Sequence, residues 1–145
     1  MKFISKSEED TKKIAKEICN FIFKNKKDGD KNVVICLIGE IGAGKTAFVK
    51  GIARYFNLPE ENISSPSYTF INDYKKFYHL DLYKLYPVVD LDSIDFWNLL
   101  EENKPKVIEW ANDILDELKL SNVDTYVVHI KRLDENSREI EVKKI

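Results

Sequence analysis

The chain contains very few of the residues that build disulfide frameworks and zinc sites. Its 145 residues include two cysteines, Cys19 and Cys36, and two histidines, His79 and His129. Neither cysteine has a second thiol or a histidine at the spacing of a zinc ligand set. Both stand among apolar residues, so we expect buried free thiols, and the sequence gives no support to a disulfide or a structural zinc.

Long hydrophobic runs and an excess of one charge are also missing. No apolar stretch approaches the about 20 residues of a transmembrane helix, and the lysine-rich, acidic N-terminus is unlike a signal peptide. The 25 acidic and 23 basic residues are spread along the chain and leave a net charge of −2, which gives no support to direct nucleic-acid binding. We expect residues 1–145 to form one cytoplasmic domain without membrane association.

Apolar residues recur with the spacings of both helices and strands, which predicts an α/β fold. Ser7 and the acids after it suit a helix N-terminus, and apolar residues at helical intervals extend this helix over residues 7–27. The apolar run at 33–38 predicts a strand covered on both faces. Helical spacing returns from residue 45.

The second half of the chain alternates between short strands and short helices. Residues 63–67, ISSPS, are expected to form a loop because Pro66 lacks an N–H donor. Strands are predicted at 68–74, 77–83 and 106–110, helices at 90–102 and 111–120, and an antiparallel hairpin from 125–133 and 139–145. The expected architecture is a single phosphate-loop NTPase-like domain with a mixed β-sheet flanked by helices.

All five glycines lie at or before Gly51, and three of them belong to one motif. Residues 39–46, GEIGAGKT, match the phosphate-loop pattern of Gly, four residues, Gly, Lys, and Ser or Thr. The motif stands between a predicted strand and a predicted helix, as a phosphate loop does. Its glycines allow successive N–H groups to turn inward around phosphate oxygens, and the helix directs its positive dipole end at the same anion.

The motif therefore predicts a site for a nucleoside triphosphate, ATP with Mg²⁺. Lys45 would contact the β- and γ-phosphates, and the Thr46 hydroxyl would ligate the metal. The residues expected to surround the phosphates are Gly39, Glu40, Ile41, Gly42, Ala43, Gly44, Lys45, Thr46 and Ala47. Because the loop contacts phosphates, it does not by itself distinguish adenine from guanine.

Two acids have the setting of the carboxylates that such sites also need. Glu109 follows the apolar pair Val107 and Ile108, and Asp81 lies within a predicted strand. Carboxylates at strand ends commonly hold the metal or the attacking water, although each acid alone can also be a solvated strand end. His79 shares a strand face with Asp81 and either orders that carboxylate or is an ordinary half-buried histidine.

Three further side chains are expected to have structural roles. His129 lies within the final hairpin, and Trp97 and Trp110 are more typical of a core or a partner surface than of ligand stacking. Trp110 nevertheless directly follows Glu109.

Other nucleotide-dependent classes fit the sequence less well. A GTPase would need an Asp-x-x-Gly switch after the loop, but no glycine follows Gly51. The NKKD string at 25–28 precedes the loop and falls at a helix end, so its likeness to a guanine-reading motif is a coincidence. A small-molecule kinase would need phosphate-clamping arginines and a lid, whereas the chain has only Arg54, Arg132 and Arg138.

Four motifs in this order and spacing resemble the TsaE family of ATPases. They are GEIGAGKT at 39–46, ISSPSYTF at 63–70, HLDLYKL at 79–85 and IEW at 108–110. The resemblance implies a weak, partner-stimulated ATPase that works with the proteins TsaB and TsaD in making threonylcarbamoyladenosine in tRNA. Contact with tRNA would then be indirect, through the complex.

The resemblance also implies residue roles. Lys45 and the loop amides would bind phosphate, Thr46 and Glu109 would hold magnesium, and Asp81 would be an acid required for hydrolysis. Segment 64–70 would respond to the nucleotide, and Trp110 would lie beside the site. Thr11 and Arg138 match positions near the nucleoside.

Three residues of this sequence differ from those that are usual in the family's motifs. Two alternative functions also remain open. Ser67, Lys84 and Ala111 stand where Thr, Arg and Pro are common, and Lys84 lacks the fork geometry of arginine. One rival is a nucleotide-responsive binding module in which hydrolysis is not essential. The other is a small phosphate-loop kinase.

Overall fold

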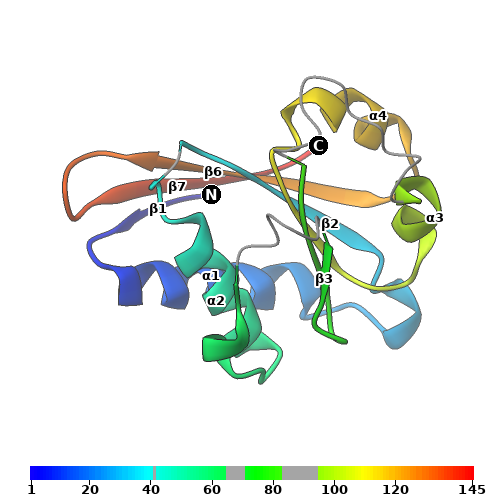
Figure 1. Cartoon of the computed structure of the whole chain (residues 1–145), viewed down its shortest axis with the longest axis horizontal. Coiled ribbons are helices and arrows are strands. Elements are labelled where there is room, and N and C mark those ends of the chain that lie inside the picture. The colour runs from blue at the N-terminus through cyan, green and yellow to red at the C-terminus, as the bar shows by residue number, and fades with distance from the viewer. Residues whose placement is uncertain (41, 65–70, 83–94) are drawn as a thin grey trace.

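A computed structural model describes residues 1–40, 42–64, 71–82 and 95–145. Its described strands form one seven-stranded sheet in the order β1-β7-β6-β2-β5-β4-β3 (Figure 1). The strands are β1 (Lys2–Ser5), β2 (Val33–Ile38), β3 (Ile71–Asp73), β4 (Tyr78–Asp81), β5 (Lys106–Glu109), β6 (Asp124–Arg132) and β7 (Arg138–Lys144). The centre, β6-β2-β5-β4, is parallel, and antiparallel strands complete both sides. The predicted mixed sheet and closing hairpin are confirmed.

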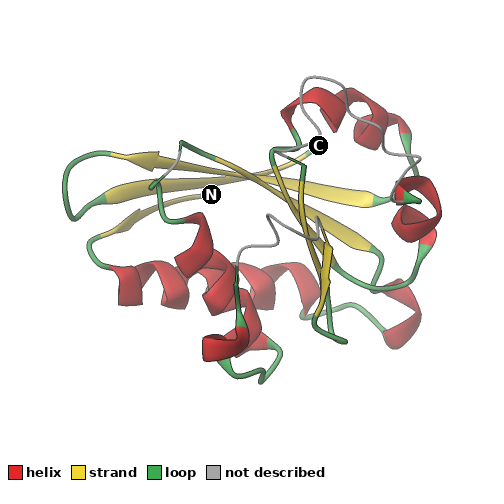
Figure 2. Ribbon diagram, viewed as in Figure 1, coloured by secondary structure: helices red, strands yellow, loops and turns green. Residues whose placement is uncertain are grey.

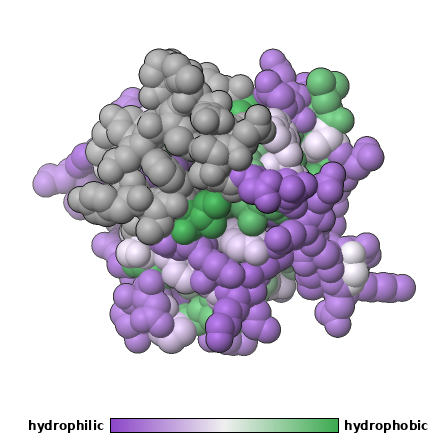
Figure 3. All heavy atoms as spheres, turned by 45° about the vertical axis from the view of Figure 1, so that its right-hand side comes forward, coloured by the Kyte–Doolittle hydropathy of each residue, from purple (hydrophilic) through white to green (hydrophobic). Residues whose placement is uncertain are grey.

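Helices cover both faces of this twisted sheet (Figure 2). The α-helices are α1 (Glu8–Phe23), α2 (Lys45–Tyr55), α3 (Phe96–Glu101) and α4 (Leu115–Leu120), and short 3₁₀ helices occur at Asp28–Asp30 (η1), Glu60–Asn62 (η2) and Asn112–Ile114 (η5). In the described part of the chain no helix is both long enough and apolar enough to cross a membrane. Hydrophilic side chains predominate on the face shown in Figure 3, with small apolar areas between them.

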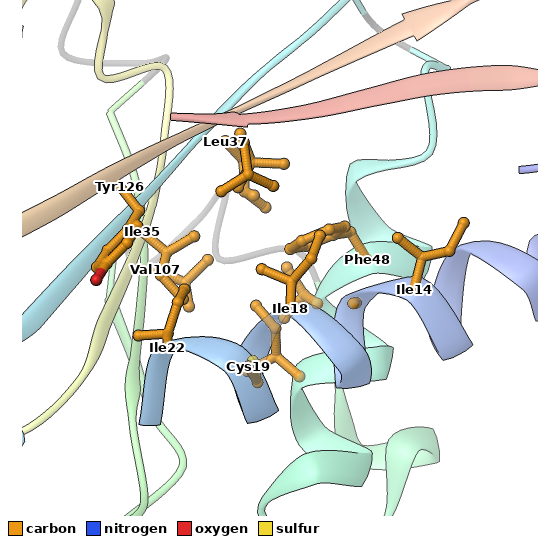
Figure 4. Packing of buried hydrophobic residues seen from close by; sticks show 14 of the residues in the cluster. Ile14, Ile18, Cys19, Ile22, Ile35, Leu37, Phe48, Val107 and Tyr126 are labelled. Atoms are coloured by element: carbon orange, nitrogen blue, oxygen red, sulfur yellow. The ribbon is translucent and has the colours of Figure 1, made fainter. Parts of the chain in front are cut away.

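Strand β2 lies between two hydrophobic clusters, which explains its uninterrupted apolar sequence. Ile35 and Leu37 pack with α1 and α2. Figure 4 shows them in one cluster with Ile18 of α1 and Phe48 of α2. The intervening residues of β2 pack with α3 and α4 on the opposite face. Alternate side chains of a strand point to opposite faces, so a strand covered on both sides has no polar face. Cys19 lies in the first cluster and Cys36 in the second, and both are buried free thiols as expected.

Helix α1 begins where the sequence predicts and ends earlier. The Ser7 side chain accepts a hydrogen bond of 3.0 Å from the Asp10 N–H, which satisfies a donor at the helix N-terminus. The helix ends at Phe23 and not at residue 27, because residues 24–27 are all polar and have no apolar side chain to bury.

Other element boundaries also differ from the predictions. The helix predicted at 111–120 is divided into η5 and α4. β4 ends at Asp81, and β5 ends at Glu109 before Trp110, whose backbone has a positive φ of 59°. The expected strand residues 68–70 and 83 and helix residues 90–94 lie outside the described residues. β1 was not predicted, because four residues carry little periodic signal and its pairing partner, β7, lies far along the sequence.

Candidate functional site

The predicted phosphate loop connects β2 to α2 with the backbone conformation that its glycines allow. Gly42 has a φ of 82° and Gly44 a φ of 108°, values that are unfavourable for residues with a Cβ atom. The Ala43 N–H donates to the Glu40 carbonyl over 3.0 Å, and α2 begins directly after Gly44. The free N–H groups of the first helical turn therefore face the loop, an arrangement suited to an anion.

A cavity of about 420 Å³ lies beside the loop and collects most of the residues that the sequence singled out. Its lining residues come from the loop, the start of α2, α1, the end of β5 and β7; they are Glu8, Thr11, Gly42, Gly44, Lys45, Thr46, Ala47, Glu109, Trp110 and Arg138. Gly39 and Glu40 line a neighbouring cavity of about 280 Å³, which shares Lys45 and Trp110 with the first. Within the loop, Ala43 is buried, and Ile41 lies outside the described residues.

Lys45 and Trp110 meet at the wall that these two cavities share. The Lys45 side chain is largely buried, and its Nζ lies 4.4 Å from the centre of the Trp110 ring. An ammonium at this distance is attracted by the electron-rich ring face. Trp110 was expected to be structural, with a place beside the site only by resemblance, and the structure puts it in the cavity wall.

The two predicted carboxylates occupy neighbouring positions at the ends of two parallel strands. Asp81 on β4 pairs in register with Glu109 on β5, and Glu109 pairs with Leu37 on β2, just before the phosphate loop. Paired residues of adjacent strands project from the same face, so both carboxylates lie on the face of α1 and α2. Both residues are buried, with exposures of 8% and 7%. Glu109 lines the cavity, and Asp81 is its neighbour across the strand pair.

His79 differs from its prediction. The sequence suggested a half-buried histidine or one that orders Asp81, but its residue exposure is only 1% and its Nε2 lies 2.5 Å from Oε2 of Glu109. The strand-face argument correctly put His79 and Asp81 on one side. It could not show that β5 lies beside β4 and presents Glu109 to the ring. His129 is exposed on β6, and its structural role stays a prediction.

Arg138 and Thr11 both line the cavity, and their expected place near the nucleoside stays a prediction. Arg138 Nε donates to the Ala43 carbonyl over 2.7 Å, so the closing hairpin is tied to the phosphate loop. A Cβ at Gly44 would lie 2.9 Å from that Nε atom, so Gly44 also leaves room for the arginine. The Thr11 hydroxyl is 2.7 Å from the Ser5 hydroxyl and also donates to the Ser7 carbonyl. The Thr11 hydroxyl is therefore bonded to the end of β1 and to the segment that joins it to α1.

Glu8 is a cavity residue that sequence reasoning missed. Its only sequence signal was a place in the acidic first turn of α1, where acids commonly stabilise the helix dipole. Its position against the phosphate loop follows from the packing of α1 on α2, which no local pattern shows.

The side chains of the cavity fit a magnesium-bound phosphate group. The Thr46 hydroxyl and the Glu109 carboxylate would supply oxygen ligands, which Mg²⁺ prefers. Among the described residues no group of three or more His, Cys, Asp or Glu side chains could hold a metal alone. Magnesium in nucleotide sites is typically held by one or two protein ligands together with phosphate oxygens. The cavity thus suits a metal that arrives with its phosphates.

Comparisons with known proteins point to the same family along nearly the whole chain. The family model described as "Threonylcarbamoyl adenosine biosynthesis protein TsaE" matches residues 5–140. A protein of Aquifex aeolicus named "tRNA threonylcarbamoyladenosine biosynthesis protein TsaE" is 37% identical over 130 residues, covering 80% of this chain and 89% of that protein. The protein of the same name from Treponema pallidum is 30% identical over 145 residues, covering 98% and 99% of the two chains.

A solved structure supports the same relationship. The crystal structure of YdiB from Bacillus subtilis superposes with a TM-score of 0.66 at 30% sequence identity, covering 97% of this chain and 82% of that one. Since the family match spans most of the sequence and relatives of 30% identity or more align over most of their own length, this chain belongs to the TsaE family.

Proposed function

We propose that this chain binds ATP with magnesium in the cavity beside the phosphate loop and hydrolyses it. The observation on which this rests is the meeting of Lys45, Thr46 and Glu109 at one cavity, although Glu109 lies more than sixty residues after the loop. A strand-to-helix turn without a ligand would need none of these three side chains. Arg138 and Thr11, at the α1 and β7 side of the cavity, are then on the nucleoside side.

The positions of the polar side chains at the cavity suit particular roles in ATP binding and hydrolysis. The loop amides and Lys45 hold the phosphates, and Thr46 and Glu109 hold the metal, which neutralises phosphate charge when bound. Asp81, buried next to Glu109, orients the attacking water or accepts its proton. The products are ADP and phosphate. The chain lacks an arginine-rich phosphate clamp, which is consistent with weak hydrolysis by the chain alone.

Family membership supports a role in tRNA threonylcarbamoyladenosine biosynthesis, the process named for its relatives. We propose that hydrolysis supports the turnover of a complex with TsaB and TsaD and is not the transfer step itself. Partner binding would then stimulate hydrolysis, and tRNA would contact the complex more than this chain. This division of labour fits a cytoplasmic protein with no pronounced basic charge.

Calorimetry on the purified chain tests nucleotide binding directly. Wild-type protein should release or absorb heat on titration with magnesium-ATP. Lys45→Ala should weaken ATP binding by about 10- to 150-fold, the range expected when a hydrogen-bonded charge is lost. Lys16→Ala on the exposed side of α1 is the matched control. Absence of binding to any magnesium nucleotide by the folded wild-type chain would refute the proposal.

A second experiment separates hydrolysis from a switch that needs only nucleotide occupancy. Asp81→Asn keeps the size of the side chain and removes its charge, so it should retain ATP binding and lose hydrolysis, alone and with TsaB and TsaD. If tRNA modification by the complex persists with this hydrolysis-deficient variant, the binding-module alternative is correct. Indifference of wild-type hydrolysis to the two partners would contradict the proposed process.

A further inference from the structure

His79 is buried beside the candidate metal ligand, yet none of the roles above uses it. It lies in the middle of β4, where its ring centre is 6.5 Å from that of Tyr74. Its Nε2 atom is 2.5 Å from Glu109 Oε2, and the side chain of His79 is only 2% exposed. An apolar side chain would fill such a place without the cost of burying a polar ring. Packing alone therefore does not explain why a histidine is paired with Glu109 at this position.

The hydrogen-bond partners of the ring determine where its proton lies. Nδ1 is buried and has no hydrogen-bond partner in the part of the chain that the structure describes. A proton on Nδ1 would thus leave a buried N–H without an acceptor, which is more costly than a bare acceptor atom. In the neutral ring, a proton on Nδ1 would also leave Nε2 with a lone pair that faces the carboxylate oxygen of Glu109 and repels it. The neutral ring avoids both penalties when Nε2 carries the proton and donates it to Glu109.

This hydrogen bond restricts the Glu109 carboxylate. With Oε2 held by a ring that itself lies on β4, the carboxyl group cannot rotate freely, so its orientation toward the cavity is restricted. Residues that hold a metal-binding side chain in this way commonly change metal affinity by about 10- to 100-fold when they are removed.

We propose that His79 is a positioning residue that orients Glu109 for magnesium through an Nε2–H···Oε2 hydrogen bond. The inference rests on the proposed function, because Glu109 is the assigned metal ligand there. It goes beyond that function by placing part of the metal affinity in a side chain that does not touch the metal, the nucleotide or the attacking water.

The test compares metal affinity with metal-free nucleotide affinity. Mn²⁺ binding to the ADP-bound chain is followed by electron paramagnetic resonance, and ADP binding in EDTA is measured by calorimetry. His79→Phe keeps a flat ring without a donor and should raise the Mn²⁺ dissociation constant about 10- to 100-fold, with ADP affinity in EDTA unchanged. His79→Gln, whose amide can donate toward Oε2, should recover most of the lost affinity.

The outcomes separate this inference from the proposed function. His129→Phe, at the other and exposed histidine, is the control and should leave both affinities unchanged. Normal wild-type binding with an unchanged Mn²⁺ affinity in His79→Phe would overturn the role of His79 alone, as would equal losses in the Phe and Gln variants. A wild-type chain without metal-dependent ADP binding would overturn the proposed function and this inference together.

A measurement on the unchanged protein covers the case in which His79→Phe does not fold. The ¹⁵N chemical shifts of the His79 ring distinguish the two neutral tautomers, and His129 provides an internal reference. We expect the proton of the neutral ring on Nε2, with a perturbation on adding Mg²⁺ and ADP. A proton on Nδ1 would overturn the proposal.

Discussion

Arg138 is a single side chain that joins the end of the sequence to the phosphate loop. It lies on β7, and its Nε donates to the carbonyl of Ala43, 95 positions earlier in the chain. Because an anion would be bound by the N–H groups of the loop, a donor that holds one loop carbonyl in place restrains the backbone that carries those groups. Arg138 therefore has a structural task in addition to its expected place near the nucleoside.

Replacing this arginine should weaken nucleotide binding without unfolding the domain. Arg138→Ala removes one hydrogen bond from a charged donor, so we expect about a 10- to 100-fold rise in the dissociation constant for ATP. Arg132→Ala is a close control, because Arg132 pairs in register with Arg138 on the same hairpin but is exposed, and its side chain donates to the Asp134 carbonyl within its own turn. Equal effects of the two substitutions, measured by calorimetry, would contradict the specific role of Arg138.

The two long helices show how an element's packing depends on one small residue. Gly51 lies in the middle of α2 at its crossing with α1, where an added Cβ would overlap the Lys12 carbonyl and lie 2.6 Å from Ala15 Cβ. Backbones can approach this closely only when one residue has no side chain. The crossing in turn positions the N-terminus of α1, and with it Glu8 and Thr11, against the cavity.

Gly51→Ala should therefore destabilise the fold although alanine favours helices. We expect the free energy of unfolding to fall by about 1–3 kcal/mol, the usual cost of overpacking, in urea denaturation. Gly29→Ala is the matched control, since a Cβ there meets no atom within 4 Å, and its effect should stay within about 0.5 kcal/mol. If both variants unfolded at the wild-type urea concentration, the proposed close contact between α1 and α2 would be wrong.

At the element level, prediction succeeded where a pattern was complete within a short segment. The apolar run of β2 and the Ser7 cap of α1 are local, and the structure confirms both, together with the predicted hairpin of β6 and β7. The period-two alternation holds less well in β6, where residues 125–128 are all buried. Helix ends and short strands were less accurate. The end of α1 and the pairing of β1 depend on whether distant surfaces offer a partner, which local periodicity does not contain.

At the scale of the whole molecule, a network of ion pairs joins three separate segments, α1, α2 and η2. Arg54 on α2 contacts Glu9 on α1 over 2.5 and 2.8 Å and Glu60 of η2 over 2.5 Å, and Lys12 on α1 contacts Glu60 over 2.7 Å. Hydrogen bonds from Arg54 and then Lys12 lower the pKa of Glu60 from 4.5 to about 2. The network thus favours the ionised carboxylate in the folded state.

This pKa shift predicts how acid affects stability. Because the folded pKa lies below the unfolded value, the pairing stabilises the fold above pH 4.5, and this contribution is lost as the pH falls toward 2. Glu60→Gln should therefore be less stable than wild type near pH 7, and the difference should shrink through this range in urea denaturation. Glu61→Gln is the control, since Glu61 forms no ion pair in the described part of the chain. A difference that stays constant with pH would contradict the assignment.

The sequence by itself determined the phosphate loop and its place between a strand and a helix. All of that information lies in eight consecutive residues and their immediate flanks, and the conformations of Gly42 and Gly44 follow from local steric rules. The same local logic identified Glu109 and Asp81 as candidate acids in or beside short apolar strands. Only the tertiary structure decided that β2, β5 and β4 are neighbours, which sets Glu109 beside the loop, Asp81 beside Glu109 and His79 on the Glu109 carboxylate. Those contacts depend on strand order and helix packing, which arise from interactions between residues far apart in the chain.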